Sequence, residues 1–434
     1  MVSASEAPAA IAALAERDDL NVLFFLVDTL RAHRLGSYGY ERDTSPTIDY
    51  LGATGVRFAR HLAQSSWTKC SMASLWTGLY PARTRVLRSG NGLPEAAKLP
   101  AEIFAEAGFR TAALWRNGWV APNFGFGQGF EVYHRPKPRP LPPELRRENP
   151  SPGLMGSDDD ILHSAHEFLR LHGDERWFLY VHLMDVHEFL YDEKSALFGV
   201  TYSDAYDNSI NHVDRILRIL LGTLATQELL DRTLVIFASD HGEAFGEHRL
   251  EGHARDVYAE VTEVPFVLSF PFRIEPGLVV RTPTANVDIW PTVLDLMGLP
   301  GLEDPDGKSL LAHIEAAARG GQSDASRTAF AHIDMTWGRT GKAPYPLVSV
   351  TKAGHRLYYP AVEPEKAELY QLRTDEREQQ NVAADNPEIV AQLREIADAY
   401  LAGPPPPWGE DGMSVEIDEM TLNQLRALGY KIDQ

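Results

Sequence analysis

The sequence predicts an α/β fold: a mixed, mostly parallel central sheet flanked by helices on both faces, with a small antiparallel C-terminal subdomain. Two observations support this. Apolar runs of strand length alternate with amphipathic segments up to about residue 330. Beyond that point, short strand-like runs joined by turns replace the alternation. We therefore expect a lead-in at residues 1–20, a main domain at 21–330, a subdomain at 331–402 and a tail at 403–434.

The strands and helices of the main domain follow from hydrophobic periodicity. Continuous apolar runs are typical of strands buried on both faces of a parallel sheet. They occur at residues 21–27, 110–115, 177–183 and 234–239. Segments with helical periodicity occur at residues 71–76, 99–107, 159–171 and 204–224. Residues 136–152 are rich in Pro and charge, which favours a surface excursion.

The C-terminal part has a different pattern. Short strands are expected at residues 347–350, 356–359 and 368–372, followed by a helix at 388–401. The prolines at 404–407 form a stiff break, and the tail beyond contains one expected helix at 422–428. The pattern therefore predicts a small antiparallel sheet beside the main domain.

Composition narrows the classes of function. Of the 434 residues, 44% are apolar and 24% are charged, as in globular proteins with a sizeable core. With 41 Lys and Arg against 61 Asp and Glu, the net charge of -20 argues against nucleic-acid binding, which depends on basic side chains. A small anionic substrate remains compatible, because a metal ion can invert the local field. Composition leaves the oligomeric state open.

The chain shows no targeting or membrane signal. No apolar run approaches the roughly 18 residues that a membrane span needs. The N-terminus lacks the basic and apolar regions of a secretory signal, so a cytoplasmic location is the default expectation. The single cysteine, Cys70, rules out an intramolecular disulfide.

Acids and histidines follow three of the predicted strands. Asp28 follows the first strand, Asp240 and His241 follow the strand at 234–239, and Asp185 and His187 follow the strand at 177–183. One such Asp alone could simply cap a loop. Since the carboxyl ends of parallel strands share one edge of the sheet, the three groups together predict a divalent-metal site there.

Several blocks of the sequence resemble the sulfatase family of the alkaline phosphatase superfamily. The matching blocks, in chain order, are NVLFFLVDTLRAHRLGSYGYERDTSPTIDYLGATGVRF, SSWTKCSMASLWTGLYP, FGFGQGFEVY, HLMDVHEF, ASDHGEAFGEH, GHARDVYAEVTEVPFVL, ELYQLRTDEREQQNVA and QLRALGY. The resemblance covers nearly the whole chain. It implies that residues 21–330 form a sulfatase-like catalytic domain.

The resemblance also identifies a candidate nucleophile. Sulfatases use a Cys or Ser, converted to formylglycine, in a Cys-x-Pro-Ser-Arg motif that begins nine residues before a Thr-Gly pair. Here that pair begins at Thr77, so the position is Thr68, which cannot become formylglycine by that route. Cys70 lies seven residues before Thr77, with Met72 and Ser74 where Pro and Arg are needed. We therefore expect Cys70 to be a packing residue and Thr68 to act unmodified, although a plain helix N-cap is the alternative reading of Thr68.

The resemblance implies a metal held by Asp28, Asp240 and His241, with Thr68 as the reactive ligand. Zinc or manganese is favoured, calcium or magnesium is possible, and one or two ions per chain are expected. A second ion would be held by Asp185, His187 and His253. The alternative is that His187 and His253 contact the substrate and supply a general acid, with His248 competing for the role of His253. Asn117 and Lys69 are further candidates for substrate binding.

The predicted activity is metal-dependent cleavage of a small anionic ester through a covalent intermediate on Thr68. Relatives with Thr at this position mostly handle phosphate esters, phosphodiesters or phosphonates, so a phosphoester is favoured over a sulfate ester. Water would make the enzyme a hydrolase, and another alcohol would make it a phosphotransferase. The rivals are a sulfuric ester hydrolase with an unmodified Thr and a non-catalytic binding protein on a degenerate sulfatase scaffold.

Overall fold

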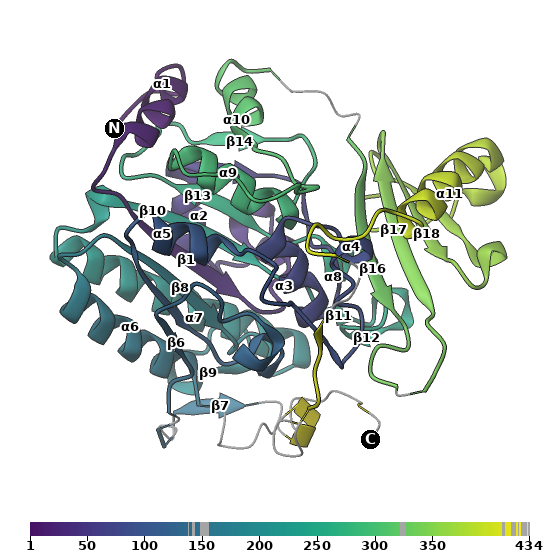
Figure 1. Cartoon of the computed structure of the whole chain (residues 1–434), viewed down its shortest axis with the longest axis horizontal. Helices are drawn as coiled ribbons and strands as arrows, with labels where there is room; N and C mark the ends of the chain where they lie inside the picture. Colours follow the sequence, from purple (N-terminus) through teal and green to yellow (C-terminus); the bar gives the residue numbers. More distant parts are fainter. Residues whose placement is uncertain are drawn as a thin grey trace.

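The computed structural model describes residues 1–137, 139–140, 144–147, 156–321, 327–339, 341–409 and 413–417, with residues 422, 423, 425, 426 and 432. It confirms the predicted fold class: a mixed, mostly parallel sheet lies between two layers of helices, and a separate antiparallel sheet follows near the C-terminus (Figure 1).

The central sheet has eight strands in the order β14-β2-β13-β10-β1-β8-β5-β6. β10, β1, β8, β5 and β6 run parallel, whereas β13 is antiparallel to both β10 and β2. The strands are β1 (Asn21–Val27), β2 (Val56–Phe58), β5 (Arg110–Leu114), β6 (Val132–His134), β8 (Trp177–Leu183), β10 (Thr233–Ser239), β13 (Phe266–Ser269) and β14 (Leu278–Val280). β1, β8 and β10 are therefore neighbours at the centre of the sheet, and all their residues are buried.

Alternating side chains of β1 enter two different cores. Phe24 packs on one face of the sheet and Phe25 on the other. Helices on the Phe24 face include α1 (Ala7–Ala12), α3 (Thr68–Thr77), α5 (Pro100–Glu106), α9 (Ile289–Leu296) and α10 (Leu311–Ala318). Helices on the Phe25 face are α2 (Pro46–Thr54), α6 (Asp158–His172) and α7 (Tyr202–Thr226). A strand that is apolar at every position is stable here because both of its faces are covered.

The C-terminal sheet contains β16 (Ala329–Asp334), β17 (Pro346–Lys352), β18 (His355–Pro360) and β19 (Glu368–Gln371), in that order. α11 (Pro387–Leu401) packs on β17 and β18. The three predicted strands are confirmed, and the unpredicted β16 adds a fourth. β16 begins before residue 331, so the sheet starts slightly earlier than the predicted boundary.

Short pairings tie distant segments together. They are β3 (His61–Leu62) with β15 (Thr284–Ala285), β11 (Ala244–Phe245) with β12 (Glu251–Gly252), β7 (Leu145–Arg147) with β9 (Leu190–Asp192), and β4 (Asn91–Gly92) with β20 (Met413–Ser414). The last pair brings part of the tail back to the main domain (Figure 1). Much of the predicted excursion at 136–152 and of the predicted helix at 422–428 lies outside the described residues. Among described helices, none combines the length and the apolar character that crossing a membrane requires.

Glu263 joins the main domain to the C-terminal sheet. Its carboxylate lies 3.1 Å from Nε2 of His33 and 3.3 Å from a guanidinium nitrogen of Arg356 on β18. Burial alone would raise the pKa of Glu263, but the His33 hydrogen bond and the Arg356 charge outweigh it and lower the pKa to about 2. The ionised carboxylate therefore stabilises the folded state above the pKa of the unfolded chain.

We expect Glu263→Gln to reduce the free energy of unfolding by about 3 kcal/mol at pH 7. Because the folded-state pKa is depressed, wild type loses this stabilisation as the pH falls from about 4.5 toward 2, and the two proteins should converge there. Urea unfolding between pH 3 and pH 7 measures the difference. A difference that stays constant across this range would show that the ion pairs do not stabilise the fold.

Candidate active site

Two aspartates meet at the carboxyl ends of neighbouring strands. Val27 of β1 pairs with Ser239 of β10, so the next residues, Asp28 and Asp240, lie side by side. Both side chains are fully buried. The backbone N–H of Thr29 donates to Oδ1 of Asp240 at 3.2 Å, which links the two strand ends. The parallel register therefore places two carboxylates at one point, as predicted from the strand ends.

Thr68 is brought to these carboxylates by a helix that is buried on every side. It is the first residue of α3, three residues before the predicted helix start, and all ten residues of this helix are buried. The hydroxyl of Ser71 donates to the backbone oxygen of Asp240 at 2.6 Å, which holds the helix against the strand end. Trp67 is the N-cap residue. The Thr68 hydroxyl instead lies 3.1 Å from Nε2 of His241, so the N-cap reading of Thr68 is wrong.

The tautomer of His241 is set by the backbone. Its Nδ1 lies 3.0 Å from the carbonyl oxygen of Gly242, and because a carbonyl only accepts, Nδ1 carries the proton. The lone pair of Nε2 therefore faces Thr68, Asp240 Oδ2 at 3.4 Å and Asp28 Oδ1 at 3.8 Å. The position after His241 must be glycine, since a Cβ there would lie 2.2 Å from the backbone oxygen of Glu260.

The donor set fits a divalent cation. Oδ1 of Asp28 and Oδ2 of Asp240 are buried and have no hydrogen-bond partner among the residues that the structure describes. Among the described residues, Asp28, Asp240 and His241 are the one group of three or more acids, histidines or cysteines whose ligand atoms lie within 4.8 Å of one another. Burial and the neighbouring Asp28 carboxylate raise the pKa of Asp240, a repulsion that a cation would relieve. Two carboxylates and one imidazole would therefore be the protein ligands of such a cation.

Asn117 and His182 orient the first aspartate. The side-chain amide of Asn117 donates to Oδ2 of Asp28 at 2.6 Å and to Thr68 Oγ1 at 3.2 Å. Nε2 of His182 lies 3.0 Å from the same Asp28 oxygen, and its Nδ1 lies 2.7 Å from the Tyr180 hydroxyl. Oδ2 is thus saturated, which leaves Oδ1 to face the site. Sequence reasoning missed His182, although a histidine inside an apolar strand is an unusual feature.

His187 and His253 lie next to this group. Their ring centroids are 4.9 Å apart, and the His253 ring lies 4.7 Å from that of His241. Nδ1 of His253 is 3.0 Å from the buried carboxylate of Glu243, a residue that sequence reasoning missed although it belongs to the Asp-His-Gly-Glu block. Burial lowers the pKa of His187 to about 4, whereas Glu243 outweighs burial and raises the pKa of His253. One histidine is therefore neutral and the other favours its protonated form.

The structure does not bring the residues of the predicted second metal site together. Asp185 does not join His187 and His253 as a ligand group within the described chain. Its carboxylate instead lies 2.5 Å from the guanidinium of Arg116 and accepts the backbone N–H of Asp158. An arginine thus supplies the positive charge that the prediction assigned to an ion.

Lys69, the other predicted substrate-binding residue, has its polar contacts elsewhere. Its ammonium is buried and donates to the carbonyl oxygens of Ser89 at 2.5 Å and Asn91 at 2.8 Å. Phe124 covers it at 3.9 Å. Burial lowers the pKa of Lys69 well below its ordinary value. The side chain therefore points away from Thr68 and anchors the segment that pairs with β20.

His248 does not compete with His253. Its Nδ1 lies 2.8 Å from Glu260 and its Nε2 lies 2.7 Å from the backbone oxygen of Glu378, so both nitrogens are engaged elsewhere. Cys70 is buried, and burial raises its thiol pKa to about 12, so the thiol stays protonated. These surroundings fit a packing residue.

The sequence is similar to that of known proteins. A model of the sulfatase family matches residues 20–299, and a model described as N-sulphoglucosamine sulphohydrolase, C-terminal, matches residues 246–399. An N-acetylgalactosamine-6-O-sulfatase of Bacteroides thetaiotaomicron is 23% identical over 478 aligned residues, covering 87% of this chain and 92% of the relative.

Solved structures confirm the fold. A structure described as a putative sulfatase of Bacteroides thetaiotaomicron has a TM-score of 0.74 at 18% identity, covering 96% of this chain and 95% of the other. The phosphonate monoester hydrolase of Agrobacterium radiobacter has a TM-score of 0.70 at 21% identity, covering 88% and 95%. At these identities the likeness concerns the fold alone.

Proposed function

Because this chain belongs to the sulfatase family of hydrolases, we propose that it cleaves a phosphate-type ester through a covalent ester on Thr68. A small anionic ester of phosphoric or phosphonic acid, or a phosphodiester, is the favoured substrate. The likeness in fold to a phosphonate monoester hydrolase is compatible with phosphorus chemistry, and the family also contains the rival sulfate chemistry.

One observation carries the proposal: the Thr68 hydroxyl lies 3.1 Å from Nε2 of His241. It lies beside carboxylate oxygens of Asp28 and Asp240 that have no partner in the described part of the chain. A threonine hydroxyl is a weak nucleophile until its proton is removed or its oxygen is coordinated. Asp28, Asp240, His241 and Thr68 would together hold a divalent ion, which supplies a lowered pKa for the hydroxyl and positive charge for the ester oxygens. Retention of this donor set argues against a non-catalytic scaffold.

In the first step, Thr68 Oγ1 loses its proton to water and attacks the phosphorus atom. The bond from phosphorus to the leaving alcohol breaks as the new bond forms. His253, kept protonated by Glu243, donates its proton to the departing alkoxide. Neutral His187 would bind a non-bridging oxygen, while the amide of Asn117 holds Asp28 and Thr68 in place.

In the second step, water attacks the phosphorus atom as the bond from phosphorus to Thr68 Oγ1 breaks, which releases the phosphate product. Oγ1 then takes a proton from solvent, which restores the hydroxyl. The water's proton passes to His253, which has become neutral after the first step. An alcohol in place of water would give the phosphotransferase reaction.

The experiment that tests the substrate class compares 4-nitrophenyl esters that differ only in the acid. We expect the phosphate, methyl phosphodiester or phenylphosphonate ester to have a kcat/KM at least tenfold above that of the sulfate ester. The assay uses wild-type protein supplied in turn with zinc, manganese, calcium or magnesium. A higher kcat/KM for the sulfate ester would instead establish the sulfuric ester hydrolase with an unmodified threonine.

Glu243→Gln is expected to reduce catalysis most for poor leaving groups. Without the carboxylate, His253 loses the charge that keeps it protonated, so alkyl esters should lose roughly 100-fold in kcat. 4-Nitrophenyl esters, whose leaving group needs no proton, should lose much less. The comparison of kcat for alkyl and 4-nitrophenyl esters of the same acid measures this difference.

His248→Gln is the matched control, since His248 also bonds a buried glutamate, Glu260, but lies outside the site. Its kcat should stay within threefold of wild type for both esters. Equal losses for the two leaving groups in Glu243→Gln would show that His253 is not the acid.

A further inference from the structure

We propose that Arg116 is a positioning residue that holds Asn117 and His187 in register around Thr68. This inference rests on the proposed function and adds to it a group outside the reacting atoms. Arg116 is 1% exposed at its side chain. It comes directly after β5 and Trp115 and directly before Asn117 in the chain.

The guanidinium connects three separate segments. One terminal nitrogen lies 2.6 Å from Asp158 and 2.5 Å from Asp185. The other lies 2.7 Å from Glu188 and donates to the carbonyl oxygen of Gly156 at 2.7 Å. The partners belong to the start of α6 and to the loop after β8. Only a planar guanidinium, with its several N–H donors, can contact all these oxygens at once. A lysine ammonium could not contact them all.

The position of these partners in the chain links the network to the site. Asp185 and Glu188 lie on the two sides of His187, in the loop that leaves β8. Asn117, next to Arg116, binds both Asp28 and Thr68 through its amide. One guanidinium therefore ties the backbone that carries Asn117 to the backbone that carries His187. A shift of about 1 Å in such groups can lower catalysis by roughly 100-fold.

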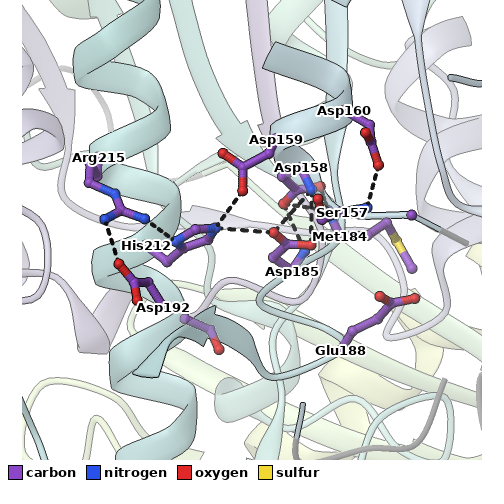
Figure 2. Close-up of polar contacts among 12 residues, drawn as sticks. Ser157, Asp158, Asp159, Asp160, Met184, Asp185, Glu188, Asp192, His212 and Arg215 are labelled. Atoms are coloured by element: carbon purple, nitrogen blue, oxygen red, sulfur yellow. Dashed lines mark hydrogen bonds and ion pairs between the residues drawn. The ribbon is translucent and has the colours of Figure 1, made fainter. Parts of the chain in front are cut away.

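The loop is held from a second side by α6. The Asp158 carboxylate accepts the backbone N–H groups of Met184 and Asp185, and the Asp185 carboxylate accepts the N–H of Asp158. Figure 2 shows these reciprocal bonds. It also shows His212 of α7, whose Nε2 lies 3.4 Å from Oδ2 of Asp185. Arg215 donates to Nδ1 of His212 at 2.8 Å, so Nε2 carries the proton that faces Asp185.

Arg116 supplies the positive charge that this network of buried acids depends on. Three buried carboxyl groups face it, and burial together with the Asp185 charge raises the pKa of Asp158 to about 7. Removing the guanidinium would leave these acids next to one another with their main counter-charge gone. The loop with His187 would then move to separate them or admit water.

The experiment compares Arg116→Met and Arg116→Lys with Arg356→Met. Arg356 is the matched control, because it is also buried and paired with two glutamates, Glu263 and Glu378, but in the C-terminal sheet. We expect Arg116→Met to lower kcat at least tenfold, with KM within threefold and metal content unchanged. Arg116→Lys should recover part of the loss. Arg356→Met should lower stability while kcat stays within threefold of wild type.

Hydrogen–deuterium exchange gives a readout that needs no substrate. Arg116→Met should speed exchange in residues 184–190, whereas Arg356→Met should not. If Arg116→Met fails to fold, Arg116→Lys and Glu188→Gln, which remove fewer contacts, take its place with smaller expected losses. A folded Arg116 variant with wild-type kcat or with unchanged exchange at 184–190 would overturn the proposal. Wild-type protein inactive toward every ester would overturn the proposed function instead, and the exchange comparison would still decide the role of Arg116.

Discussion

Replacing Thr68 with alanine is expected to lower kcat by roughly 10⁴-fold or more while the chain still folds. The change removes the proposed nucleophile and its contacts with Asn117 and His241, at 3.2 Å and 3.1 Å. The cost in stability should be about 3 kcal/mol, since two hydrogen bonds and one buried methyl group are lost. Steady-state kinetics with the best ester of the panel, together with thermal unfolding, measures both effects.

The same experiment can show the covalent ester directly. Rapid quenching of wild-type protein during turnover should give a peptide containing Thr68 with the mass of one added phosphoryl group, and Thr68→Ala should give none. Cys70→Ala is the control from the same helix, and its kcat should stay within threefold of wild type because the thiol is buried and protonated. Substantial turnover by Thr68→Ala would refute the nucleophile.

Removing the metal ligands should have the second-largest effect. We expect purified wild-type protein to contain one divalent ion per chain, and Asp240→Asn and His241→Ala to retain less than a tenth of it. Turnover should fall with the metal content. A chelator should also lower the melting temperature, because an ion at 100 times its Kd stabilises the folded state by about 2.7 kcal/mol. Elemental analysis and thermal unfolding make the measurement independent of the substrate.

Asp185→Asn distinguishes one ion from two. In the structure Asp185 binds Arg116 at 2.5 Å, so this variant should keep its one ion. Two ions in wild type and one in Asp185→Asn would support the second metal site at Asp185, His187 and His253. An ion content of zero in wild-type protein supplied with metal, with full activity, would exclude the proposed chemistry altogether.

Much of the site could be predicted from the amino-acid sequence. The strand-end residues Asp28, Asp240 and His241 were predicted to converge, and they do, because neighbouring parallel strands end at one edge of the sheet. The resemblance to the sulfatase nucleophile motif implied that Thr68 lies beside them, and its hydroxyl lies there. When parallel strands pair in register, the residues that follow them in the sequence come to lie next to one another.

The errors concern charged side chains whose partners lie far away in the chain. Asp185 follows a central strand as Asp28 does, yet it pairs with Arg116. Lys69 is adjacent to Thr68 but points into an aromatic cluster. His248 and His253 are alternatives in the sequence, and the structure separates them, because Glu260 binds His248 and Glu243 binds His253. In each case the residue type suggested a possible role at the site, but the sequence did not show which residue would be its partner.

Residue order alone was sufficient for the α/β architecture, the resemblance to sulfatases and the group formed by Asp28, Thr68, Asp240 and His241. Three-dimensional packing was needed to separate metal ligands from ion pairs and to reveal His182, Glu243 and Arg116. The physical reason is that backbone periodicity and strand register act over short stretches of chain. The partner of a buried charge is set by which distant segments meet, and by which arrangement neutralises it when water is excluded.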